Sequence, residues 1–400
     1  MSVNIIPDQW NCQELRSIAT INYGKSPSSI LSSDGQIPVM GTGGVERYGN
    51  DFIYDGDSII ISRKGTIDRI TFAKGKFWVI DTAYFLSDYD DVDVRWLYYF
   101  LQTIDFRGMN EATGVPSLSR DSLYKIEVSK PPKPEQSKIA EILSTIDRAI
   151  DQTEVLIAKQ QRIKTGLMHD LLTRGIVEHG NLPSEETHEF KDSPLGRIPV
   201  EWECSPLSRF VPSAEYGIST SLGDSGCPVL RMNNLFDGEA DLSDLKYTDI
   251  TVPETLWLRN GDVLFNRTNS WEHVGRTGIW RGQIEKATFA SYLVRLNPDP
   301  NVLVSELLNI WLNWESIQIS IRRVATPAVQ QVNINPTNLR SIYAAFPSCL
   351  DEQREIVKRL SGVQKAIMSS IKGLSKLRSL RGIRAVTIFE PVDGPVIKDT

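Results

Sequence analysis

The sequence predicts a mixed α/β protein made of two copies of one unit, each a globular domain followed by a long helix. Two observations lead to this fold class. Two long stretches carry apolar residues at alternating steps of three and four, which places those residues along one side of a helix. Short landmarks also recur in the same order in both halves of the 400-residue chain, as expected after an internal duplication.

The first long helix is expected over residues 134–174. Pro134 is tolerated in a first helical turn, and Glu135 suits the positive end of the helix dipole. A helix of this length spans ~55 Å, and it cannot bury a one-sided apolar stripe without a partner helix. The residues that we expect at its helix–helix interface are Ile139, Ile142, Ile146, Ile150, Leu156, Ile157, Ile163 and Leu167.

The partner helix is expected over residues 350–384. Gln136 aligns with Gln353, and Ile139 with Ile356, at one constant offset. Two unrelated amphipathic helices are therefore the weaker interpretation. The interface residues expected on this second helix are Ile356, Leu360, Val363, Ile367, Ile371, Leu374 and Leu377.

The globular copies are expected over residues 1–133 and 198–349, with a polar linker over 175–197 and a tail over 385–400. The matched landmarks are Ile6–Trp10 and Ile198–Trp202, Tyr23-Gly24 and Tyr216-Gly217, Gly56-Asp57 and Gly261-Asp262, and Ala112-Thr113 and Ala325-Thr326. Apolar and β-branched runs predict strands over 58–62, 77–80, 125–128, 263–266, 290–296 and 342–346. Helical periodicity predicts helices over 94–103 and 305–319.

The composition is that of a globular protein, with 40% hydrophobic and 24% charged residues. No run of eighteen apolar residues occurs and the first residues lack a secretory pattern, so we expect neither a membrane span nor a signal peptide. The four cysteines form no CxxC pair, which predicts reduced thiols in the cytoplasm. The net charge of −6 argues only mildly against a nucleic-acid partner, because basic residues predominate over 351–384 and acidic residues over 175–197.

The motifs that could carry catalysis are incomplete. Residues 24–26 read Gly-Lys-Ser, but Ala19 stands where a phosphate-binding loop needs glycine, and Pro27 follows. The nuclease-like triplets at 189–191 and 244–246 are short enough to arise by chance. No glycine fingerprint follows a strand to bind a dinucleotide or an adenosyl cofactor. We therefore expect no catalytic residue, no metal site and no cofactor in this chain.

Polar and basic residues in the loops remain as candidates for reading the edges of DNA bases. Arginine pairs bidentately with guanine, and asparagine or glutamine with adenine. Taken one at a time, such residues are more often ordinary solvated surface residues. Both copies, however, place arginine beside serine or asparagine after the Gly-Asp strand. The candidates are Lys25, Arg47, Arg63, Lys64, Thr66 and Arg69 in the first copy, and Arg231, Asn233, Asn234, Asn266, Arg267, Asn269, Arg276, Gln330 and Gln331 in the second.

Nearly the whole chain resembles the specificity subunit of type I restriction-modification systems. The resemblance rests on the repeated plan and on the segments PPKPEQSKIAEIL, QQRIKTGLMHDLL, FKDSPLGRIPVEW and LDEQREIVKRL. It implies two α/β target recognition domains joined by two long helices, which pair as an antiparallel coiled coil with pseudo-two-fold symmetry. It also implies that each domain reads one half of a bipartite, asymmetric target in double-stranded DNA.

The resemblance further implies partners for this chain. The helices would set the spacing of the half-sites and dock two adenine-N6 methyltransferase subunits, which in turn allow restriction subunits to join. S-adenosylmethionine, ATP and Mg²⁺ would then be used by those partners and not by this chain. The first helix ends in GLMHDLL but the second continues as LRGIRAVTIFEPVDG, so the resemblance leaves open whether the two docking ends are equivalent.

Two other classes of function stay open at the level of sequence. One is a single-chain restriction or modification enzyme, which the missing catalytic motifs disfavour. The other is a two-lobed protein-interaction scaffold that binds no nucleic acid, which the negative net charge favours.

Overall fold

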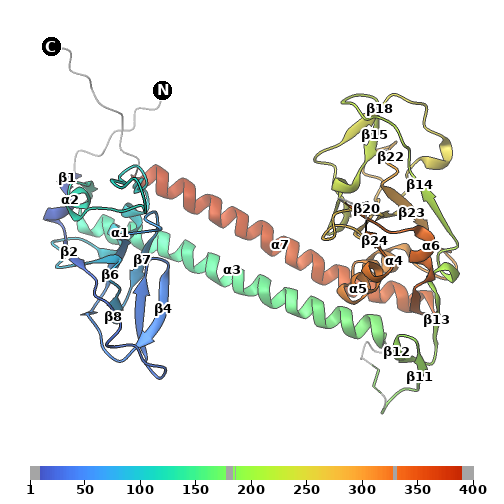
Figure 1. The fold of residues 1–400 in the computed structure, drawn as a ribbon, viewed down its shortest axis with the longest axis horizontal. Coiled ribbons are helices and arrows are strands. Elements are labelled where there is room, and N and C mark those ends of the chain that lie inside the picture. The colour runs from blue at the N-terminus through green and yellow to red at the C-terminus, as the bar shows by residue number, and fades with distance from the viewer. Residues whose placement is uncertain (1–9, 177–182, 185, 328–330, 390–400) are drawn as a thin grey trace. The chain divides into compact units, whose positions relative to one another are not determined.

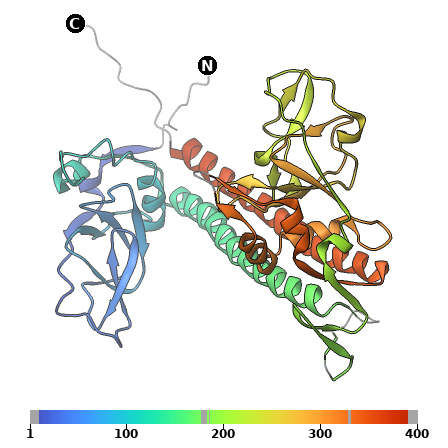
Figure 2. The ribbon, with the colours of Figure 1, turned by 45° about the vertical axis from the view of Figure 1, so that its right-hand side comes forward.

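The computed structural model describes residues 10–176, 183–184, 186–327 and 331–389, with the side chains of the last helix described through Gly382. The chain divides into two compact units, a first unit of Met1–Leu156 with Ser370–Thr400 and a second unit of Ile157–Ser369. Each unit contains one globular domain and a part of both long helices, α3 (Lys133–Thr173) and α7 (Leu350–Phe389). Figures 1 and 2 show these two helices and the domains from which they emerge.

The first domain is built on two four-stranded sheets and one ladder of two strands. One sheet has the order β2 (Thr20–Tyr23), β9 (Ala83–Ser87), β6 (Ser58–Ser62) and β7 (Ile70–Ala73). The other has the order β4 (Gly44–Gly49), β3 (Ile37–Gly41), β8 (Lys76–Val79) and β5 (Tyr54–Asp55). The ladder pairs β1 (Asn11–Glu14) with β10 (Glu127–Lys130), and the helices are α1 (Val94–Leu101) and α2 (Arg120–Tyr124).

The second domain contains more and shorter strands. Its largest sheet has six strands, in the order β14 (Ser213–Tyr216), β23 (Leu293–Asn297), β19 (Val263–Asn266), β21 (Thr277–Ile279), β17 (Gly238–Ala240) and β16 (Leu235–Phe236). Two further sheets have three strands each. One has the order β18 (Lys246–Thr248), β15 (Cys227–Leu230) and β22 (Thr288–Phe289). The other has the order β20 (Thr268–Asn269), β25 (Val332–Asn333) and β24 (Thr326–Pro327). The ladder pairs β13 (Trp202–Pro206) with β26 (Tyr343–Pro347), and the helices are α4 (Ser305–Leu312), α5 (Glu315–Arg323) and α6 (Pro336–Ser341).

The two domains use the same strand pairings. β6 pairs antiparallel with β7 and β9, and β19 pairs in the same way with β21 and β23. β3 pairs parallel with β8, as β15 does with β22. The ladder of β1 and β10 has its counterpart in that of β13 and β26. The repeated landmarks of the sequence therefore mark one framework that is used twice.

In the first unit, the domain packs against the start of α3 and the end of α7. Ile139 and Leu143 of α3 belong to the apolar core that surrounds the fully buried Trp96. The Arg381 guanidinium of α7 donates to Gln102 of the domain and forms an ion pair with Asp147 of α3 at 3.1 Å. Both long helices are thus fixed to the domain in this unit.

In the second unit, the domain packs against the end of α3 and the start of α7. Leu171 of α3 and Ile356 and Leu360 of α7 belong to the core of the second domain. The Ile176 backbone N–H donates to Glu352 of α7 at 3.0 Å, just beyond the end of α3. Burial raises the pKa of the Glu352 carboxyl, while the bond from Ile176 opposes that shift.

Several of the expected helix-interface residues lie elsewhere. Leu156 is 46% exposed, Ile163 50% and Ile371 43%, so these three side chains are not buried in a seam. A straight α-helix drifts ~20° per heptad from a strict 3.5-residue repeat, which carries part of a long stripe away from the partner. Ile139, Ile356 and Leu360 are buried, but in the domain cores. Of the remaining expected residues, Ile157, Ile367 and Leu374 are buried and Ile142, Ile146, Ile150, Leu167, Val363 and Leu377 are half-buried.

The boundaries differ from the expected ones in both long helices, in the linker and in one helix of the second domain. α3 occupies 133–173 instead of 134–174, and α7 continues to Phe389 instead of residue 384. The expected linker contains a β-hairpin of β11 (Phe190–Ser193) and β12 (Gly196–Pro199). The helix expected over 305–319 is two helices, α4 and α5, and the Asn313 side chain at the break bonds to Thr277. Among the helices in the described ranges, none combines the length and hydropathy needed to cross a membrane.

Candidate nucleic-acid interface

A tyrosine and an arginine lie together at the ends of two neighbouring strands in the first domain. Tyr23 is the last residue of β2 and is 45% exposed, and Arg63 directly follows β6. The guanidinium carbon of Arg63 lies 5.2 Å from the centre of the Tyr23 ring, within the range of a cation–π contact. Arg63 Nη1 also donates to the backbone carbonyl of Asp81 at 3.1 Å.

The second domain repeats this arrangement. Tyr216 is the last residue of β14 and is 48% exposed, and Arg267 directly follows β19. The guanidinium carbon of Arg267 lies 5.1 Å from the Tyr216 ring centre, and Nη1 donates to the Ser291 carbonyl at 3.3 Å. We refer to Tyr23 with Arg63, and to Tyr216 with Arg267, as the Tyr–Arg pairs.

A glycine fixes each tyrosine close to a neighbouring strand. A Cβ atom added at Gly24 would lie 2.0 Å from the Ile80 carbonyl oxygen, and one added at Gly217 would lie 2.1 Å from that of Phe289. Only glycine permits such an approach, which explains why both copies read Tyr-Gly at this place. The main chain directly after each tyrosine is therefore fixed in place, and this restrains the position of the tyrosine.

The loop that follows each arginine is braced by a second loop of the same domain. In the first domain the Leu118 N–H donates to the Arg63 carbonyl at 3.0 Å, and Lys64 forms a bridge with Ser117. In the second domain the Ile334 N–H donates to the Arg267 carbonyl at 2.8 Å, and β20 pairs with β25. The residues after the arginines differ between the domains, but equivalent backbone hydrogen bonds hold them in place.

The two domains differ at one further cation. Arg120, the first residue of α2, places its guanidinium carbon 5.1 Å from the Tyr23 ring centre. Its position after the braced loop corresponds to Pro336, the first residue of α6. Burial raises the pKa of the neighbouring Tyr84 to about 12, and that phenol is therefore neutral at physiological pH. The first domain consequently gathers two positive charges around one neutral aromatic cluster.

The other candidates of the first domain lie on its surface. Lys25, Arg47, Lys64, Thr66 and Arg69 are exposed. The backbone of Lys25 is fixed by its N–H to the Val79 carbonyl at 2.8 Å, and its own carbonyl accepts from Trp78 Nε1 at 2.8 Å. These side chains are placed where a large ligand can reach them.

The candidates around Arg231 form an internally bonded turn. Arg231 forms an ion pair with Asp244 at 2.7 Å. The Asn234 side chain is 1% exposed, accepts from the Arg231 N–H at 2.8 Å and donates to the Asp241 carbonyl at 2.9 Å. Asn234 therefore stabilises the turn and is not the surface residue that we expected, whereas Asn233 is exposed.

Asn266 also lies inside the domain, because it is the last residue of the buried strand β19. It is 1% exposed, and its amide donates to the His273 carbonyl at 3.3 Å. Asn269, Arg267 and Arg276 are half-buried and Gln331 is exposed. Gln330 lies outside the described residues. Nowhere in the described ranges do three or more His, Cys, Asp or Glu side chains form a group that could hold a metal ion.

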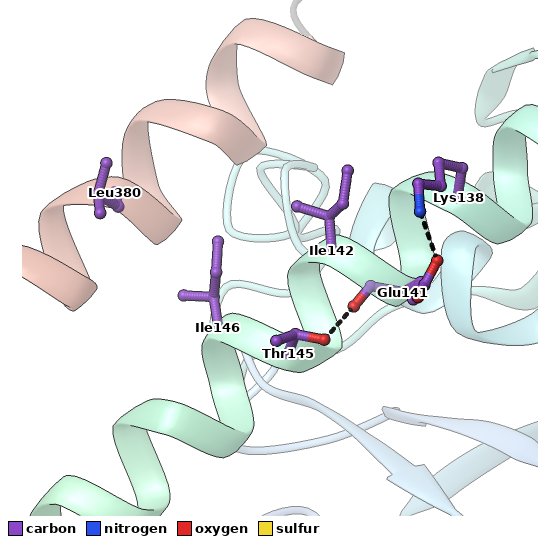
Figure 3. Close-up of a pocket in the computed structure, with 6 residues that line it drawn as sticks. All are labelled: Lys138, Glu141, Ile142, Thr145, Ile146 and Leu380. Atoms are coloured by element: carbon purple, nitrogen blue, oxygen red, sulfur yellow. Dashed lines mark hydrogen bonds and ion pairs between the residues drawn. The ribbon is translucent and has the colours of Figure 1, made fainter.

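A second candidate surface is an open groove of about 310 Å³ between α3 and α7 in the first unit. Figure 3 shows Ile142 and Ile146 of α3 facing Leu380 of α7. Lys138 and Glu141 form an ion pair at 2.8 Å at one side of the groove. The apolar stripe of α3 is thus partly uncovered here, which explains why Ile142 and Ile146 are only half-buried.

The first part of the chain matches the family model of the type I restriction modification DNA specificity domain over residues 7–161. Relatives of the chain bear the corresponding name. The type I restriction enzyme MjaVIII specificity subunit of Methanocaldococcus jannaschii is 24% identical over 278 residues, or 65% of this chain and 64% of that protein. The EcoBI specificity subunit of Escherichia coli is 26% identical over 260 residues, or 62% of this chain and 53% of that protein. The resemblance to these specificity subunits is therefore confirmed.

Solved structures share the fold over almost the full chain. The S subunit of a type I restriction-modification system from M. genitalium superposes with a TM-score of 0.66 at 14% identity, covering 98% of both chains. A chain from a structure of type I system assembly superposes with a TM-score of 0.52 at 14% identity, covering 96% of this chain and 98% of that chain. The mixed α/β class with two long helices is thus that of known S subunits.

Sequence reasoning missed three residues of the candidate interface. Tyr23 and Tyr216 served only as markers of the repeat, and Arg120 received no role. The signal for the tyrosines was the repeated Tyr-Gly pair, because an exposed aromatic residue before a sterically required glycine is fixed in place. Nothing in the sequence pairs Arg120 with Tyr23, because the two residues are 97 positions apart and only the fold brings them together.

Proposed function

We propose that this protein is the DNA-recognition subunit of a type I restriction-modification complex and that each domain reads one half of a bipartite, asymmetric target. The observation that carries the proposal is one strand framework that occurs twice with different side chains in its loops. Lys64 follows the first arginine, where Thr268 and Asn269 follow the second. Equivalent backbones with different polar side chains suit two readers of the same kind of ligand with different base sequences.

The long helices would set the distance between the two half-sites. We infer an antiparallel coiled coil with pseudo-two-fold symmetry. Within the first unit, Asp147 pairs with Arg381 at 3.1 Å and Glu154 with Arg378 at 2.7 Å. From one ion pair to the next, the residue numbers increase along α3 and decrease along α7, which supports an antiparallel arrangement of the two helices.

The catalytic steps would belong to partner subunits. Two methyltransferase subunits that modify adenine N6 would dock on the helices, and restriction subunits would join them, all in the cytoplasm where the DNA lies. S-adenosylmethionine, ATP and Mg²⁺ would be used by those partners. The apolar groove around Ile142 and Ile146 is one surface for such docking. The two docking ends would differ, because α7 continues to Phe389 whereas Gly175, in the left-handed region at φ 75°, follows the end of α3.

The division of labour is tested by exchanging one domain. Residues 1–130 are replaced by the matching domain of a related specificity subunit, and methylated adenines are mapped across the genome of the expressing cells. We expect one half of the methylated target to change and the other half to stay the same. A change in both halves would show that the domains do not read independently.

Binding to DNA is tested directly with the full chain and its methyltransferase partner on duplex DNA. Phosphate contacts make the logarithm of the binding constant fall linearly with the logarithm of salt concentration, by ~0.9 per neutralised phosphate. A steep inverse slope is expected for the proposed function. Absence of binding at low salt would instead favour the protein scaffold that binds no nucleic acid.

A further inference from the structure

Whatever is identical in two domains that read different sequences cannot encode the difference between those sequences. The Tyr–Arg pairs are identical in residue type and in their place at the ends of equivalent strands, and each arginine bonds a backbone carbonyl at an equivalent position. The residues that follow the arginines are not identical. The pairs should therefore contact a part of the ligand that is the same in both half-sites.

We propose that Tyr23 with Arg63, and Tyr216 with Arg267, are matched phosphate clamps that hold the DNA backbone in the same way in each domain. This inference rests on the proposed function. The part of DNA that repeats irrespective of sequence is its sugar–phosphate backbone, and contacts to it fix register and orientation without reading bases. The residues after each arginine would then meet the base edges.

The geometry suits a phosphate oxygen. A guanidinium group has five N–H donors in a planar fork that matches the phosphate group. The Asp81 and Ser291 carbonyls each accept from one Nη1, which fixes the orientation of the fork. Each guanidinium also lies over an exposed tyrosine ring, and this cation–π contact restrains it further. Neither guanidinium belongs to an ion pair with a carboxylate within the described part of the chain.

Both domains also contain an arginine that offers a matched control. Arg16 forms an ion pair with Glu14 at 2.8 Å and lies over the Tyr124 ring at 5.8 Å. Arg209 forms an ion pair with Glu203 at 3.0 Å in the corresponding turn of the second domain. These arginines are already neutralised by a carboxylate, so they should contribute little to phosphate binding.

The test compares Arg63→Ala and Arg267→Ala with Arg16→Ala and Arg209→Ala in the full chain bound to its methyltransferase partner. Binding is measured on the mapped target duplex, on duplexes with one half-site scrambled, and over a series of salt concentrations. We expect each clamp variant to bind about tenfold more weakly on all duplexes. We also expect it to lower the salt slope by ~1, while the control variants keep wild-type values.

The outcomes separate this inference from the proposed function. If wild-type protein binds the target with a steep salt slope but the clamp variants match the controls, the clamps are refuted and the proposed function stands. If a clamp variant loses preference at one base pair, with an unchanged salt slope, the arginine reads a base. A base-reading pair would also require the same base at equivalent places in both half-sites, which the mapped target reveals. If wild-type protein binds no duplex, both proposals fail.

A conservative substitution guards against misfolding. Arg63→Lys and Arg267→Lys keep the positive charge but lose the planar fork. They should retain the salt slope of the wild type and lose only part of the affinity. Equal losses in the lysine and alanine variants, together with lowered thermal stability, would mean that the arginines stabilise the loops and do not clamp DNA.

Discussion

Replacing Gln353 by glutamate should loosen the second domain on its helix more than the matched Gln136→Glu substitution loosens the first. Both glutamines are fully buried in the first turns of their long helices. Gln353 Nε2 donates to the Val302 and Pro347 carbonyls at 2.8 Å each, and Oε1 accepts from the Val304 N–H at 2.8 Å. Within the described part of the chain, Gln136 Nε2 donates to one carbonyl, that of Pro131, at 2.8 Å, and Oε1 accepts from the Asp93 N–H at 2.7 Å.

The magnitude follows from the number of donors that are lost. Glutamate has the shape of glutamine but replaces the donating nitrogen with an oxygen. Each buried carbonyl that loses its donor costs about 1–3 kcal/mol. Gln136→Glu should therefore lower the free energy of unfolding by about 1–3 kcal/mol and Gln353→Glu by about 2–6 kcal/mol. The helix dipole favours a carboxylate at both sites to a similar extent, so it does not alter the order.

The assay must follow the two units separately, because a chain of two units need not unfold in one step. Denaturant unfolding gives the midpoints, and hydrogen exchange of peptides around Asp93 and Val304 shows which junction has opened. Gln152→Glu, at an exposed position of α3, is the control and should leave both unchanged. Equal effects of the two buried substitutions, or faster exchange at the wrong junction, would refute this account of the junctions.

Three other predictions follow from the geometry. Burial raises the pKa of Glu352 above 4.5, so the wild-type protein should lose stability relative to Glu352→Gln as the pH rises above 4.5. If the unfolding midpoints of the two proteins differ by the same amount at pH 4 and at pH 8, this prediction is wrong. Ile146→Asp with Ile150→Asp places two carboxylates on the half-buried side of α3 and should cost several kcal/mol, so an unchanged thermal midpoint would rule out packing there. Four residues inserted beside Leu167 lengthen α3 by ~6 Å, which should add one or two base pairs, at ~3.4 Å each, between unchanged half-sites in the genome-wide methylation map.

The long helices and the doubled framework could be predicted because their signals are local or repeated. The alternating steps from Ile139 to Leu171 recur often enough to define a helix to within one residue at each end. Whether a single residue of the apolar stripe is buried or exposed could not be predicted in the same way. Leu156 and Ile163 fit the stripe but are exposed, because the path of a partner helix depends on both surfaces together. The hairpin of β11 and β12 arises in a polar segment whose few apolar residues give no clear alternation.

The candidate site shows the same limit at the level of side chains. Arg63 and Arg267 could be found from their repeated place after a strand. Asn234, which has the residue type that reads adenine, is buried in a turn, because asparagine also satisfies backbone groups in turns. Sequence alone cannot separate these two uses of an asparagine, since the acceptors it meets come from residues that only the fold brings near.

The structure separates the residues that hold each domain from the residues that would choose its bases. The first domain is held through Gln136 and Ile139 at the start of α3, and by Arg381 at the end of α7, which bonds to Gln102. The hydrogen bonds of Gln136 and Arg381 do not involve the loops after β2 and β6. Substitutions in those loops can therefore change the surface that the loops present without moving the domain on its helices. If each domain reads one half-site as proposed, this separation would keep the register between the two half-sites, because a domain that shifted with every loop substitution would lose it.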